Sequence, residues 1–129
     1  MTQRTERLRR LLRVQNKLTA MHEMRRAGLL NQANAADAEA TEIAARKDDA
    51  GSLSGLFPDL YERGITRAME KRDGFVEAAA AEAGKIAREN ARKNRIEQDF
   101  HASRRIDDRK AEEVSGLEAV ERLIAPRKT

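Results

Sequence analysis

Side chains able to do chemistry are few in this chain, and their spacing matches no catalytic or metal-binding pattern. The two histidines, His22 and His101, belong to no His-x-x-x-His or Glu-x-x-His pair, so no metal site is predicted. Asp-Asp pairs stand at 48–49 and 107–108. We interpret both as solvated surface charge, because general acid–base catalysis needs a pocket that shifts a carboxylate pKa. There is no glycine-rich phosphate-binding motif, and we predict no cofactor, no catalytic residue and no enzymatic activity.

A dense basic run near the N-terminus is a candidate binding surface. Arg9, Arg10 and Arg13 are its centre, in the sequence RTERLRRLLR that starts at Arg4. Such a run attracts an acidic protein groove, a nucleic acid or an anionic lipid. No aromatic residue is interleaved for base stacking. This favours a protein partner over nucleic acid, and a solvated helix face that binds nothing remains the alternative.

A second candidate surface lies at the end of the only cluster of Gly, Ser and Pro, which spans residues 48–58. Such clusters form turns. Phe57, Leu60 and Tyr61 place two of the four aromatic residues of the chain here. They either close the end of a helix pair as an apolar plug or form an exposed docking tip.

Composition indicates that long helices must position these residues. The chain has 129 residues, a net charge of +4, 37% charged residues and no cysteine, so disulfides and thiolate metal sites are excluded. Ala, Glu, Lys, Leu and Arg make up over half of it, which is typical of coiled coils. We predict a single all-α domain over residues 1–129, an antiparallel two-helix coiled-coil hairpin. Its first helix would span about 3–47, its turn 48–58, and its longer second helix about 59–125.

Local signals support these helix ends. Thr2 or Thr5 can cap the first helix, because a hydroxyl accepts a hydrogen bond from an unpaired N-terminal amide. Pro58 suits the first turn of the second helix. Asp59 and Glu62 have the spacing of a capping box.

Apolar spacing predicts which faces of the two helices meet. On the first helix, the expected face contains residues three and four positions apart, namely Leu8, Leu11, Val14, Leu18, Met21 and Leu29. Leu18, Leu29 and Ala40 are eleven residues apart, which indicates nearly straight or slightly right-handed winding. The expected facing pairs are Ile43 with Ile65, Leu29 with Ala79, Met21 with Ile86, Leu11 with Ile96, and Leu8 with Phe100.

In this register the second helix extends past the N-terminus after about Ile106. The extension still carries Val114, Leu117, Val120 and Ile124 at helical spacing. An amphipathic stripe without a partner in its own chain is typical of a binding helix. We therefore count these four among the candidate partner-binding residues.

The sequence shows no membrane segment. Its longest uncharged run is about ten residues, against the roughly 20 that a spanning helix needs. No apolar segment of the secretory type follows the basic N-terminus, because Arg13 interrupts it. We expect a cytoplasmic protein that would reach a membrane only through its partners.

Three features together resemble a known family. They are the basic start at residues 7–13, the loop with Leu56-Phe57-Pro58, and the arginine-rich stretch 104–109 before the end of the second helix. The pattern resembles the stalk proteins of bacterial type III export, the FliJ-like family of flagellar systems and its YscO-like counterparts in injectisomes. The resemblance implies a small cytoplasmic coiled-coil hairpin whose terminal end enters the export ATPase ring while its shaft or tip contacts the export gate.

We therefore expect a non-enzymatic coiled-coil stalk or adaptor that couples an export ATPase ring to an export gate. Two alternatives remain open. One is an unrelated cytoplasmic coiled-coil scaffold, and the other is a basic helical protein associated with nucleic acid.

Overall fold

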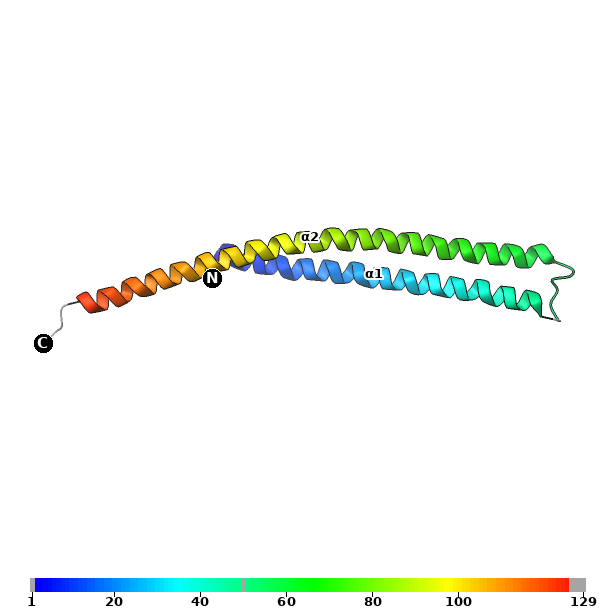
Figure 1. Cartoon of the computed structure of the whole chain (residues 1–129), viewed down its shortest axis with the longest axis horizontal. Coiled ribbons are helices and arrows are strands. Elements are labelled where there is room, and N and C mark those ends of the chain that lie inside the picture. The colour runs from blue at the N-terminus through cyan, green and yellow to red at the C-terminus, as the bar shows by residue number, and fades with distance from the viewer. Residues whose placement is uncertain (1, 50, 126–129) are drawn as a thin grey trace. The chain divides into compact units, whose positions relative to one another are not determined.

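The computed structural model describes residues 2–49 and 51–125; Ala50, within the expected turn, lies outside them. The described chain is all-α and has two helices, α1 over Gln3–Asp48 and the longer α2 over Pro58–Ile124 (Figure 1). The expected ranges were 3–47 and 59–125. The predicted fold class, a helical hairpin with a longer second helix, is confirmed.

The hairpin consists of two compact units. The first contains residues 1–17 together with 90–129, and the second contains residues 18–89. In each unit a segment of α1 packs against a segment of α2 that runs in the opposite direction. The two termini of the chain therefore belong to the first unit, and the turn belongs to the second.

Hydrogen bonds from short polar side chains fix both ends of α1. The hydroxyl oxygen of Thr2 accepts the amide N–H of Thr5 at 3.3 Å, so Thr2 is the N-cap. At the other end, Ser52 and Ser54 both donate to the backbone carbonyl of Lys47 at 2.9 Å. These bonds satisfy a carbonyl that the ending helix leaves without an amide partner.

The expected capping box at the start of α2 is wrong. The helix begins at Pro58, so Asp59 already lies inside the first turn. The Glu62 carboxylate is bonded to the Lys47 ammonium group on α1 instead. Glu62 therefore ties the start of α2 to the end of α1.

Small residues form the core of the second unit. Ala33, Ala36 and Ala40 of α1 are buried, as are Ala68 and Ala79 of α2. Ala33, Ala36 and Ala40 are three and four residues apart, the spacing of a heptad repeat that winds paired helices to the left. The expected eleven-residue spacing is wrong, because Leu18 at its start is exposed.

Gly64 lets the two helices of this unit approach closely. A Cβ atom added there would lie 3.3 Å from Cδ1 of Ile43. Ile43 therefore lies close to the backbone of α2 one residue before Ile65, which agrees with the expected facing of Ile43 and Ile65. Both isoleucines are half-buried.

The first unit has a mixed core. Thr5, Gln15, Phe100 and Ser103 are buried, and Leu12 is half-buried. No buried side-chain polar atom of the described residues lacks a hydrogen-bond partner. The polar residues of this interface are therefore satisfied, which removes most of the cost of burying them.

Over the first half of α1, the residues that pack against α2 lie one position away in the sequence from those predicted. Leu11, Val14, Leu18 and Met21 are 44, 55, 36 and 38% exposed, respectively. The interface positions instead follow the heptad through Thr5, Leu8, Leu12 and Gln15 in the first unit and Thr19 and His22 in the second. Leu8 with Phe100 and Leu29 with Ala79 remain at the interface as expected. Leu11 with Ile96 and Met21 with Ile86 do not, because the first member of each pair faces solvent.

Candidate functional site

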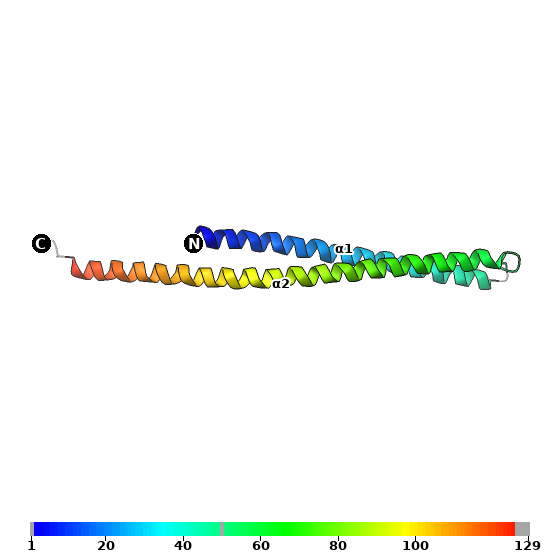
Figure 2. The same ribbon diagram turned by 90° about the horizontal axis from the view of Figure 1, so that it is seen from above.

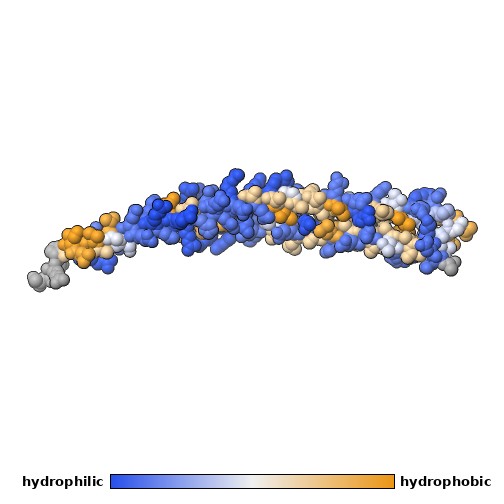
Figure 3. Space-filling model, viewed as in Figure 1, coloured by the Kyte–Doolittle hydropathy of each residue, from blue (hydrophilic) through white to orange (hydrophobic). Residues whose placement is uncertain are grey.

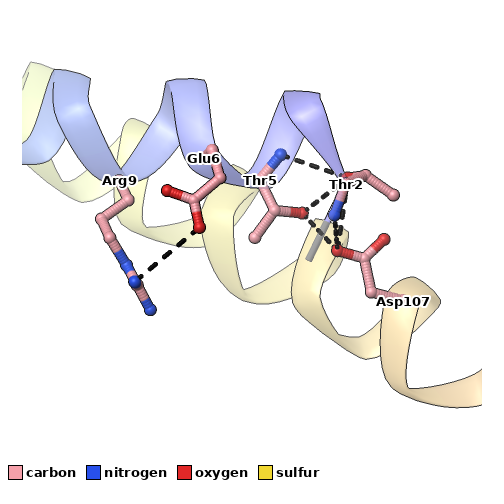
Figure 4. Close-up of polar contacts among 5 residues, drawn as sticks. All are labelled: Thr2, Thr5, Glu6, Arg9 and Asp107. Atoms are coloured by element: carbon pink, nitrogen blue, oxygen red, sulfur yellow. Dashed lines mark hydrogen bonds and ion pairs between the residues drawn. The ribbon is translucent and has the colours of Figure 1, made fainter. Parts of the chain in front are cut away.

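A polar cluster closes the paired region at the start of α1 (Figure 4). Asp107 of α2 accepts hydrogen bonds from the Thr2 backbone N–H at 3.0 Å, the Thr2 hydroxyl at 3.3 Å and the Thr5 hydroxyl at 2.6 Å. The Thr5 and Ser103 hydroxyl oxygens are 2.6 Å apart. Because the Thr5 proton goes to Asp107, Ser103 donates to Thr5.

These hydrogen bonds stabilise the ionised form of the Asp107 carboxyl group. The hydroxyl of Thr5, followed by the backbone N–H of Thr2, holds the pKa of Asp107 below its ordinary value. The interpretation of Asp107 as plain surface charge is therefore wrong. It is the anchor that joins the first residues of α1 to α2, and it marks the last level at which α1 covers α2.

Beyond Asp107, α2 continues alone. We call residues 108–124 the overhang. All of them are exposed and helical, and Figures 1 and 2 show the helix continuing past the start of α1. The exposed fractions of its large apolar side chains are as follows: Val114 55%, Leu117 65%, Val120 49%, Leu123 86% and Ile124 74%. Hydrophobic atoms gather at this end of α2 in Figure 3.

The overhang carries forward the heptad by which α2 meets α1. In the first unit that heptad includes Ile96, Phe100, Ser103 and Asp107, and it continues to Lys110, Val114, Leu117, Glu121 and Ile124. Val114, Leu117 and Ile124 were expected from their apolar character. The sequence analysis did not identify Lys110 and Glu121. A charged residue can be assigned to an interface position only when the phase of the heptad is known.

The basic start lies in the first unit, as does the overhang. The Arg9 guanidinium stacks 6.0 Å from the centre of the Phe100 ring and lies 3.9 Å from Glu6. Arg10 and Arg13 are exposed. Arg9 thus supports the helix–helix interface, whereas Arg10 and Arg13 are available to an anionic partner.

The turn residues belong to the second unit. Phe57 and Leu60 are 55 and 65% exposed, so they do not form the apolar plug that was one expectation. Tyr61 is half-buried, and its hydroxyl accepts the backbone N–H of Leu53 at 3.3 Å. Tyr61 therefore stabilises the turn, while Phe57 and Leu60 are presented to solvent.

His22 lies at the edge of the helix–helix interface. Its Nδ1 is 2.7 Å from the carboxylate of Glu82, and the two side chains are 12 and 10% exposed. This hydrogen bond, together with one from Lys85, holds the pKa of Glu82 below its ordinary value. Within 2–49 and 51–125, no three His, Cys, Asp or Glu side chains gather where they could hold a metal ion.

Among the described residues, no helix is long and apolar enough to cross a membrane.

Comparison of the chain with protein-family models, with curated proteins and with solved structures found no match.

Proposed function

We propose that this chain is a non-enzymatic coiled-coil stalk or adaptor whose overhang binds a protein partner. The observation that supports this most strongly is the exposed apolar stripe of the overhang. Val114, Leu117 and Ile124 continue the helix–helix interface of α2 beyond the point where α1 begins. Exposed apolar surface costs about 25 cal/mol per Å² when left in water, and a helix with such a stripe is suited to a groove or to another helix.

The class of the proposed partner comes from the resemblance to export stalk proteins in the basic start, the loop and the arginine-rich stretch. A stalk of bacterial type III export is cytoplasmic, and its terminal end enters the ring of the export ATPase. The overhang would be the inserted part, and Arg10 and Arg13, in the same unit, would meet acidic side chains. Phe57 and Leu60 at the turn would meet the export gate. The mechanism would be mechanical: conformational changes of the ring during its nucleotide cycle would move the hairpin, and the hairpin would transmit that movement to the gate.

The test uses the export ATPase encoded in the same genome, purified and mixed with the full chain. We expect saturable binding that Leu117→Asp weakens by at least tenfold, because it puts a charge at the centre of the apolar stripe. Met24→Asp is the control, since Met24 is also an exposed apolar residue of a helix, at 76%, but belongs neither to the overhang nor to the basic start.

Two results would contradict the proposal. One is the absence of binding between the native chain and that ATPase. The other is an equal loss of binding for Leu117→Asp and Met24→Asp. Steeply salt-dependent binding to a duplex oligonucleotide, abolished by replacing Arg10 and Arg13 with glutamate, would instead favour the nucleic-acid alternative.

A further inference from the structure

The overhang has the length, the apolar pattern and the charge order needed to pair with itself. We propose that two copies of the chain associate through their overhangs as an antiparallel pair of helices. Each overhang would then take, on the other copy, the place that α1 takes on α2 in the first unit. This proposal does not rest on the proposed export function, but both use the same apolar stripe, so the dimer would have to open before the overhang could bind another protein.

The first argument is continuity. The heptad positions of α2 that meet α1 run without interruption into Lys110, Val114, Leu117, Glu121 and Ile124. A helix that already packs against an antiparallel partner up to Asp107 presents the same face, in the same phase, for the following residues. A second antiparallel helix extends that interface without any change in the winding of α2.

The second argument is charge. With the symmetry axis midway between Val114 and Leu117, Val114 of each copy lies opposite Leu117 of the other. The same register places Lys110 opposite Glu121 of the second copy, and Glu121 opposite its Lys110. The two apolar layers are then flanked on each side by one Lys–Glu ion pair. Charged residues at interface positions of a coiled coil specify its register at a cost in stability, and complementary charges across an interface disfavour wrong pairings.

The third argument is length. In this register Ile124, the last residue of α2, lies level with Asp107 of the second copy. Asp107 is where Thr2 and Thr5 are anchored. The paired positions from Lys110 to Glu121 therefore all lie beyond the level of Asp107, on the part of α2 that α1 leaves uncovered.

The flanking positions agree with this register. In antiparallel pairs the residues beside the core of one helix face their equivalents on the other, which sets Glu113 beside Val120 and Glu118 beside Ala111. No like charges meet there. The paired stretch is short, however, and would bury less than the roughly 1,200 Å² of standard stable interfaces. We therefore expect a weak dimer whose population rises with protein concentration.

Sedimentation velocity of the full chain over a concentration series at low salt tests the proposal. We expect a monomer that converts to a dimer as the concentration rises, and Leu117→Asp should abolish this conversion. Lys110→Glu and Glu121→Lys each replace two attractive pairs by two repulsive ones, so each should raise the dissociation constant roughly tenfold. The double variant restores both pairs with reversed sign and should recover the native value.

Glu112→Lys is the control for charge alone. It makes the same change as Glu121→Lys, on an exposed residue outside the paired face, and should leave the dissociation constant within twofold of the native value. A chain that stays monomeric up to about millimolar concentration would overturn the proposal. So would a dimer that survives Leu117→Asp, or a double charge reversal that fails to restore pairing. None of these results would bear on binding to the export ATPase.

Discussion

The structure places Phe100 of α2 inside the helix–helix interface and Leu11 of α1 outside it, and truncating each of these two large side chains tests that assignment. Phe100 is 8% exposed and packs in the interface of the first unit, whereas Leu11 is 44% exposed. We predict that Phe100→Ala strongly destabilises the protein and that Leu11→Ala does so only slightly. The apolar pattern of the sequence makes the second half of this prediction unexpected, because it places Leu11 in the interface.

The magnitude follows from burial. A buried aromatic side chain removes about 150–250 Å² from water, worth about 4–6 kcal/mol at about 25 cal/mol per Å². Residual structure in the unfolded chain reduces such estimates by up to about 40%. We therefore expect Phe100→Ala to lower the free energy of unfolding by about 3 kcal/mol, which includes the loss of the ring under Arg9. Leu11→Ala should cost under about 1 kcal/mol, because nearly half of the side chain is already in water and Ala is a better helix former.

Urea unfolding followed by helical circular dichroism measures both values. A difference of about 2 kcal/mol corresponds to roughly 8 °C between the melting temperatures of the two variants for a chain of this size. An equal loss of stability, or a larger loss for Leu11→Ala, would show that α1 packs on the face predicted from its leucines and that the heptad assignment is wrong.

Two further predictions concern the backbone and pH. Gly28→Ala should raise the free energy of unfolding by up to about 1 kcal/mol, since Gly28 is helical and its added Cβ meets nothing within 4 Å. Gly64→Ala should gain less or lose stability, because its Cβ would press on Ile43 at 3.3 Å; equal gains in thermal melting would contradict that close approach. The depressed pKa of Asp107 means that its hydrogen bonds stabilise the fold above the unfolded pKa and are lost as pH falls through the folded one. Urea midpoints measured from pH 7 down to pH 3 should therefore fall less steeply for Asp107→Asn than for the native chain, and parallel curves would refute this.

The sequence predicted the hairpin and the approximate register because two signals agree. The Gly-, Ser- and Pro-rich segment 48–58 has no competitor elsewhere in the chain, and it fixes how far each residue lies from the turn. The unequal lengths of the helices then place the overhang without any knowledge of side-chain packing. Val114, Leu117 and Ile124 could be identified for that reason.

The face by which the first half of α1 packs against α2 could not be predicted. Two sets of residues with heptad spacing, one position apart in the sequence, could both form that face. One contains Leu11, Val14 and Leu18, and apolar character alone selects it. The other passes through Thr5 and Gln15, and its advantage depends on residues far away in the sequence. Hydrogen bonds from Thr5 to Ser103 and Asp107, and the phase of the alanine core in the second unit, favour that second stripe. The charged positions of the overhang were missed for the same reason.

The measurement that tests the central claim most directly is hydrogen exchange of the full chain at a concentration where it is monomeric. If the overhang has no partner in its own chain, amides of residues 112–124 should exchange rapidly, while those of 93–107 are protected by packing against α1. Protection of 112–124 should then rise at a concentration where the chain self-associates, or when the export ATPase is added. Full protection of 112–124 in a proven monomer would mean that the overhang packs against its own chain, and both the proposed partner-binding role and the self-pairing would be wrong.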